Sequence, residues 1–179
     1  MTTATPVRTG VSLDALLAAK ERRAARQADW LTHHQQPVIS LTLVTPGQIK
    51  DSLRYRNTMG VALQMCDQLL WENRWQVLDR QVLWLPTGPE ALWCVAHPAA
   101  EIKAHCAELE QTHTLGRLRD LDVICPENGH VGRQSLGSHL RRCLICDEPA
   151  HACSRSRHHP VEQVVSRVEK MIDDWFARD

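Results

Sequence analysis

The chain has 179 residues, which is enough for one compact domain with its own apolar core. Its 21 basic and 21 acidic side chains give a formal net charge of zero, so bulk charge favours binding neither to nucleic acid nor to an anionic membrane surface. No apolar run is long enough to span a bilayer or to form the core of a signal peptide. We therefore expect a cytoplasmic protein whose seven cysteines are reduced thiols or metal ligands.

Apolar periodicity, capping residues and turn residues predict a series of helices and strands. In chain order these are a helix over residues 12–33, a strand over 38–44, a helix over 48–72, two strands over 75–85 and 91–96 around a turn at 86–89, and a helix over 98–111. A strand with Asp120 and Asp122 comes next, followed by a turn at 126–129, a return strand over 131–134, the polar segment 135–159 and a closing helix over 160–177.

This order of elements predicts an α+β (mixed α/β) fold in which helices flank a mixed sheet. We expect a single domain with a core at 12–134, a small segment rich in Cys, Arg and His at 135–159, and the closing helix at 160–177. The apolar residues of that helix recur at i, i+3 and i+4, a stripe typical of a helix that covers a core.

The most informative motif is Asp120-x-Asp122, which lies between apolar neighbours on a short strand. Residues i and i+2 of a strand point to the same face, so the two carboxylates should project together. They repel each other unless a cation lies between them, and Mg²⁺ takes hard oxygen ligands and bridges carboxylates to phosphates. Arg117 and Arg119 follow the same alternation, and guanidinium groups match phosphate oxygens. The alternative is an exposed strand face with alternating charges.

Other side chains extend this interpretation. Lys50 lies near the predicted start of the second helix, where backbone N–H groups attract phosphate, and Arg54 follows one turn later. Glu110 and His113 lie at the end of the helix that leads into the aspartate strand, so they are candidates for a third metal carboxylate and a general base. The alternatives are an ordinary capped helix start and a surface Glu–His pair.

A cluster of potential metal ligands lies in the polar segment, as Cys143-x₂-Cys146-x₆-Cys153-x₅-His159. Two cysteines separated by two residues form half of a tetrahedral zinc site, and Cys153 with His159, or with His158, would complete it. A bound metal would explain how a segment with few apolar residues folds. Two alternatives stay open: reduced cysteines beside an arginine-rich substrate loop, or a reactive thiol at Cys146 or Cys153 whose pKa is lowered by nearby arginines.

Three segments together resemble one known family. They are Pro46-Gly47-x-Ile49-Lys50-Asp51-Ser52, then Glu108-Leu109-Glu110-x₂-His113-x-Leu115-Gly116-Arg117-Leu118-x-Asp120-x-Asp122-Val123, and Arg141-Arg142-Cys143-Leu144-x-Cys146-x₆-Cys153-x-Arg155-x₃-His159. On these motifs the chain is similar, from about Ser12 onward, to the holo-citrate lyase synthases, the apo-citrate lyase phosphoribosyl-dephospho-CoA transferase family. The resemblance also implies a nucleotidyltransferase-like sheet, although Gly116-Arg117 stands close to the aspartates where that superfamily places Gly-Ser further upstream.

The resemblance implies an enzyme, a nucleotidyltransferase. Its donor would be 2′-(5″-triphosphoribosyl)-3′-dephospho-CoA, its acceptor a serine of the acyl-carrier (gamma) subunit of citrate lyase, and its leaving group diphosphate. Asp120 and Asp122 would bind Mg²⁺, and Glu110 or His113 would take the serine proton. The residues that the resemblance implies for donor binding are Lys50, Arg54, Gly116, Arg117, Arg142 and Arg155. Neither nucleic acid nor a membrane is expected as a partner.

Two other functions fit parts of the sequence. A different nucleotidyltransferase would use the same Asp120-x-Asp122 motif on another acceptor, and its nucleotide preference would distinguish it. A non-enzymatic, zinc-dependent interaction module would need the cysteine cluster but neither aspartate.

Overall fold

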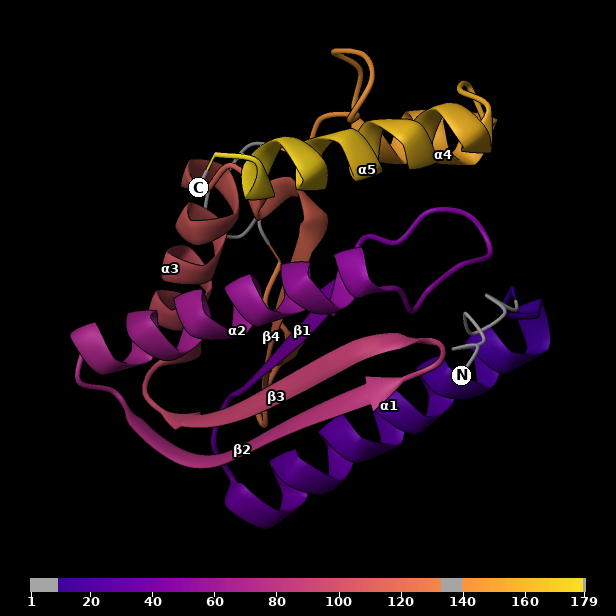
Figure 1. Cartoon of the computed structure of the whole chain (residues 1–179). Coiled ribbons are helices and arrows are strands. Elements are labelled where there is room, and N and C mark those ends of the chain that lie inside the picture. Colours follow the sequence, from indigo (N-terminus) through magenta and orange to yellow (C-terminus); the bar gives the residue numbers. More distant parts are fainter. Residues whose placement is uncertain (1–9, 133–139, 179) are drawn as a thin grey trace, which may run out of the picture.

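The computed structural model describes residues 10–132 and 140–178. The helices are α1 (Leu13–His34), α2 (Leu53–Glu72), α3 (Ala99–Thr112), α4 (Ala150–Ser156) and α5 (Val161–Phe176), with a 3₁₀ turn η1 (Gly116–Leu118). The strands are β1 (Val38–Leu43), β2 (Gln76–Leu85), β3 (Gly88–Ala96), β4 (Arg119–Cys125) and β5 (Gly129–His130). Figure 1 shows their arrangement.

These strands form one sheet in the order β2-β3-β1-β4-β5, and each neighbouring pair is antiparallel. The predicted α+β class is confirmed. The sheet, which was predicted to be mixed, is antiparallel throughout the described strands. The reason is that each helical crossover skips a strand. Helix α2 joins β1 to β2 with β3 between them, and α3 joins β3 to β4 with β1 between them. This is the split β-α-β arrangement of ferredoxin-like folds.

One face of the sheet forms the main apolar core with α2 and α3. Ile39 and Leu41 of β1, Trp93 of β3 and Val123 of β4 are almost completely buried there. Each such side chain contributes roughly 1.5–3 kcal/mol when it is removed from water. The main core therefore runs along the three adjacent strands β3, β1 and β4.

The other face of the sheet is covered by α1, where polar contacts lie beside buried apolar side chains such as Val38 and Leu92. The Gln27 side chain donates a hydrogen bond to Ser40 Oγ of β1 at 2.9 Å. Arg23 and Arg26 bind the buried carboxylate of Glu90 at 3.0 and 2.9 Å. Because Ser40 and Glu90 alternate with the core residues of their strands, α1 lies opposite α2 and α3 (Figure 1). The aspartates of β4 face this same polar side.

A second, smaller core lies beneath α5. Val168 and Ile172 of α5 are buried against Tyr55 of α2 and Leu115 and Leu118 around η1. This confirms that the apolar stripe predicted for the closing helix covers a core. No helix in the described part of the chain is both long enough and apolar enough to cross a membrane.

Several predicted elements differ from the structure. Helix α2 starts at Leu53 rather than near residue 48, because Ser52 is its N-cap and accepts a hydrogen bond from the Tyr55 N–H at 3.2 Å. Gly47, with φ of 77°, turns the chain in the loop before it. Strand β5 is Gly129–His130, so it precedes the predicted return strand; residues 131 and 132 belong to no strand, and 133–134 lie outside the described residues. Helix α4 was not predicted at all.

Candidate active site

Asp120 and Asp122 project from the same face of β4. Asp120 is paired with Thr42 of β1 and Asp122 with Ser40, while Leu121 between them faces the main core. Burial raises the pKa of the Asp122 carboxyl above its usual value, and the neighbouring Asp120 raises it further. The Asp120 side chain is 50% exposed, with Arg141 Nη1 3.6 Å from its Oδ1. Two close carboxylates of this kind form a hard-oxygen donor set, which fits a divalent cation.

A polar hollow of about 340 Å³ adjoins Asp120 on the α1 side of the sheet. Lys20 and Arg23 of α1 and Lys50 of the loop before α2 line it with Asp120. Burial lowers the pKa of Lys50, and the positive charge of Lys20 lowers it further, so the two ammonium groups lie close enough to repel each other. The Lys50 ammonium also donates a hydrogen bond to the Thr45 carbonyl. Glu90 also lines the hollow and neutralises Arg23, which leaves the two lysines beside Asp120, an arrangement that suits a metal-bound polyphosphate.

Glu110 of α3 is buried at the edge of β4. Its Oε1 accepts hydrogen bonds from the Leu121 N–H at 2.7 Å and from Arg141 Nη2 at 2.8 Å. Lys103 of the same helix donates to the Leu121 carbonyl at 2.7 Å. The two side chains therefore satisfy the backbone of β4 where β5, which pairs only with Ile124 and Cys125, does not reach. Among these contacts, the link between Glu110 and Asp120 is the guanidinium of Arg141, which approaches both carboxylates.

His113 lies on the opposite side of the sheet from the aspartates. Its Nδ1 accepts a hydrogen bond from the Leu115 N–H at 3.0 Å and lies 3.0 Å from Nη2 of Arg119, a fully buried residue on the core face of β4. Its ring packs against Trp175 of α5, with centroids 4.7 Å apart. Burial, with the charge of Arg119, lowers the pKa of His113 to about 4. The structure does not bring His113 together with Asp120 and Asp122.

Gly116 and Arg117 form part of η1, between α3 and β4. Gly116 packs directly beneath the backbone of Glu110, and a Cβ there would lie 2.1 Å from the Glu110 carbonyl oxygen. Arg117 donates a hydrogen bond to the Arg142 carbonyl. Burial lowers the pKa of Arg117, and the neighbouring guanidinium of Arg141 lowers it further. Gly116 therefore allows close packing, while Arg117 and Arg141 concentrate positive charge.

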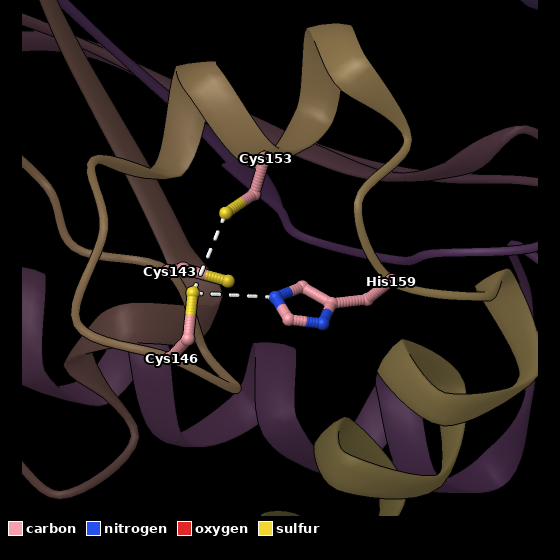
Figure 2. A group of neighbouring side chains, drawn as sticks. All are labelled: Cys143, Cys146, Cys153 and His159. Carbon is pink, nitrogen blue, oxygen red and sulfur yellow. Dashed lines mark hydrogen bonds between the residues drawn. The ribbon is translucent and has the colours of Figure 1, made fainter.

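The four predicted metal ligands converge on one point (Figure 2). One ligand atom from each of Cys143, Cys146, Cys153 and His159 lies within 4.8 Å of the others. Cys146 Sγ is 3.5 Å from Cys153 Sγ and 3.3 Å from His159 Nε2. A tetrahedral zinc ion with ligands at about 2.0–2.3 Å needs this spacing. Three sulfurs and one imidazole nitrogen are a donor set that fits zinc.

The backbone around the cluster explains its order. The chain at 141–150 doubles back, with the Cys143 N–H bonded to the Glu148 carbonyl at 2.8 Å and the Ala150 N–H to the Arg141 carbonyl at 2.8 Å. Helix α4 then places Cys153 in a buried position. Without a cation, burial and the neighbouring cysteines raise the pKa of the Cys153 thiol to about 12.

The remaining predicted donor-binding residues lie away from the aspartates. Arg54 binds Asp173 of α5 at 2.8 and 3.0 Å. Arg142 donates to the Asp147 carbonyl at 2.9 Å within its own loop. Arg155 is exposed on α4. None of these contacts involves Asp120 or Asp122.

Sequence reasoning missed His130, which the structure places on the aspartate face. In the β4–β5 hairpin His130 is paired with Ile124, and Ile124 shares a face with Asp122 and Asp120. His130 is exposed and is one of the groups whose charge acts on Asp122. Asn128-Gly129 is a recognisable hairpin signal, but Gly129 is paired with Cys125, so the loop is Pro126–Asn128 and the two-residue turn that the signal indicates would have set another register.

The geometry can be compared with known proteins. Residues 11–175 match the family model described as apo-citrate lyase phosphoribosyl-dephospho-CoA transferase. The chain belongs to this family. A protein of that name from Shigella flexneri serotype 5b (strain 8401) is 37% identical over 167 residues, which cover 93% of this chain and 91% of that protein. A second, from Escherichia coli O1:K1 / APEC, is 36% identical with the same coverage.

Proposed function

We propose that this protein transfers the phosphoribosyl-dephospho-CoA group of 2′-(5″-triphosphoribosyl)-3′-dephospho-CoA to a serine of the acyl-carrier (gamma) subunit of apo-citrate lyase, with diphosphate as the leaving group. The observation that carries the proposal is family membership across residues 11–175, a range that includes both the aspartate pair and the cysteine cluster. The names of the relatives supply the transferred group and apo-citrate lyase. The subunit and the serine are part of our proposal, as is a cytoplasmic location.

Asp120 and Asp122 would hold Mg²⁺ in this reaction. The bound ion would neutralise charge on the phosphoryl oxygens while a serine oxygen forms a bond to the α-phosphorus and the bond to diphosphate breaks. Lys20 and Lys50 line the hollow beside Asp120 and would bind the departing diphosphate. Arg141, which Glu110 binds at 2.8 Å, lies 3.6 Å from the Asp120 carboxylate and would add positive charge there.

The proton of the attacking serine needs an acceptor on the aspartate face. His130 is exposed on that face, and imidazole is the side chain that takes a proton near neutral pH. Glu110, by contrast, is buried and binds Arg141 and the β4 backbone, so it serves to position Arg141. We expect His130→Gln to lower the transfer rate by about a hundredfold while donor affinity stays the same. An unchanged transfer rate would show that His130 is not the general base.

Cys143, Cys146, Cys153 and His159 would hold a structural zinc ion. The support is the convergence of their four ligand atoms. The ion would supply folding energy to a segment whose seven-residue helix α4 buries only Cys153. A zinc site of this closed type leaves no open position for substrate. We therefore assign chemistry to the aspartate site and scaffolding to the cysteine site.

Intact-mass measurement of the carrier subunit tests the proposal directly. After incubation with the protein, Mg²⁺ and the donor, the carrier should gain the mass of one phosphoribosyl-dephospho-CoA group. Asp120→Asn and Asp122→Asn should each slow this by on the order of a thousandfold, about 4 kcal/mol of transition-state stabilisation. Asp174→Asn, at an exposed α5 carboxylate paired with Lys170, is the matched control and should leave the rate unchanged.

The same assay separates the rival functions. A carrier whose acceptor serine is changed to alanine should stay unlabelled, and ATP should not replace the donor. Efficient labelling from ATP would indicate a different nucleotidyltransferase. Full labelling by either aspartate variant would reject the site.

A further inference from the structure

A cavity of about 730 Å³ lies between the cysteine cluster, the start of α5 and the loop after β1. Its apolar lining comes from three elements and includes Val44, Pro46, Leu144, Ile145, Val161 and Val164. Ligand-binding sites in proteins have about this volume, roughly 300–1,000 Å³, with mainly apolar walls and a few polar groups. We call this space the arginine cavity, because Arg117, Arg141 and Arg157 also line it.

The positive charge of the arginine cavity is only partly neutralised. Arg141 binds Glu110 at 2.8 Å. Arg117 donates to a backbone carbonyl, and within residues 10–132 and 140–178 neither it nor Arg157 forms an ion pair with a carboxylate. Cations held beside apolar walls without carboxylate partners suit an anionic ligand with an apolar part.

The arginine cavity adjoins the aspartate site. Arg141 lines the cavity and also approaches Asp120 to 3.6 Å, so one guanidinium contacts both places. The polar hollow with Lys50 is lined by Asp120 itself. A ligand with two charged groups therefore has two sites close to the carboxylate that would hold Mg²⁺.

We propose that the arginine cavity binds the adenosine diphosphate part of the donor's dephospho-CoA, with the diphosphate on Arg117 and Arg157 and the adenine against the apolar wall. This inference rests on the proposed function, because the donor is taken from it. The cysteine cluster builds one wall, since Cys143, Cys153 and His159 line the cavity. The metal site therefore shapes the donor site without touching the reacting phosphate.

Equilibrium binding of 3′-dephospho-CoA, measured by calorimetry without Mg²⁺ or carrier, tests this inference. Arg117→Ala removes a cation, and Val164→Trp fills the cavity from α5. Each should weaken binding by about tenfold or more, which corresponds to about 1.4 kcal/mol. Arg22→Ala, at an exposed position on α1 outside the cavity, should bind within about twofold of the parent. ADP should compete with dephospho-CoA, whereas pantetheine should not.

The outcomes separate this inference from the proposed function. Asp120→Asn should lose transfer yet bind dephospho-CoA normally, because it lies outside the cavity lining. If the parent binds dephospho-CoA and both cavity variants lose it, the cavity assignment holds even where no carrier is labelled. Normal dephospho-CoA binding by both variants, or no binding by the parent, overturns it. Loss of carrier binding alone would instead identify a protein-docking groove. Zinc content and unfolding temperature show whether each variant is folded.

Discussion

Gly116 should tolerate no side chain, because α3 passes directly over it. A Cβ added there would lie 2.1 Å from the carbonyl oxygen of Glu110 and 2.6 Å from its carbonyl carbon. These are backbone atoms of a residue whose side chain binds both Arg141 and β4, so they cannot shift without disturbing those contacts. Overpacking usually costs about 1–3 kcal/mol, and a backbone clash places Gly116→Ala at the upper end, about 3 kcal/mol.

Urea unfolding measures this cost as a lower midpoint with an unchanged slope, and the melting temperature should fall by roughly 6–12 °C for a chain of this size. Gly60→Ala is the matched control. Gly60 lies within α2 with no atom within 4 Å of an added Cβ, so the change should stabilise the helix by about 0.5–1 kcal/mol. A Gly116→Ala protein as stable as the parent would refute the packing argument. Lost donor binding at full stability would support a direct binding role.

Two further predictions concern the metal cluster and His113. Protein purified without chelators should contain about one zinc per chain by elemental analysis, and Cys143→Ser should lose it while Cys66→Ser in the core keeps it. Chelation should lower the unfolding temperature, and metal-free protein of full stability would favour reduced thiols. The pKa of His113 is about 4 in the folded protein and about 6.5 in an unfolded chain, so acid favours the unfolded chain, which binds the proton more tightly. The contribution of His113 to the free energy of unfolding is therefore complete above about pH 6.5 and is lost as the pH falls toward 4. His113→Gln should flatten that part of the stability–pH curve from urea midpoints, and an unchanged slope would contradict it.

The aspartate pair and the cysteine cluster were predictable because local spacing determines their geometry. Alternation along a strand requires Asp120 and Asp122 to share a face, and the register with β1 shows that they do. The cysteine spacing indicated shared metal ligation, and the ligand atoms of Cys143 and Cys146 do converge. The start of the helix predicted from residue 12 was readable for the same reason, since Ser12 is the N-cap of α1 and its Oγ accepts the Ala15 N–H at 3.2 Å.

The surroundings of Glu110 and His113 were not predictable, because they depend on distant parts of the chain. Glu110 binds the β4 backbone at Leu121, which β5 does not reach, and burial lowers the pKa of His113, whose ring packs against Trp175 of α5. Helix α4 escaped prediction because its one buried residue is Cys153, so it has no apolar stripe. Patterns along the sequence report local geometry, whereas burial and charge depend on which elements meet.

The central position of β1 has a consequence for biosynthesis. Val38 is opposite Cys94 on one side and Ile124 on the other, so both neighbours of this strand are translated long after it. A ribosome therefore exposes the apolar strand 38–43 while neither partner exists. Pairings between such distant segments form slowly, and unpaired strand edges promote aggregation during that interval. Both edges of β1 are paired only once residues 119–125 emerge, so a shorter nascent chain leaves at least one edge of this apolar strand open to other chains.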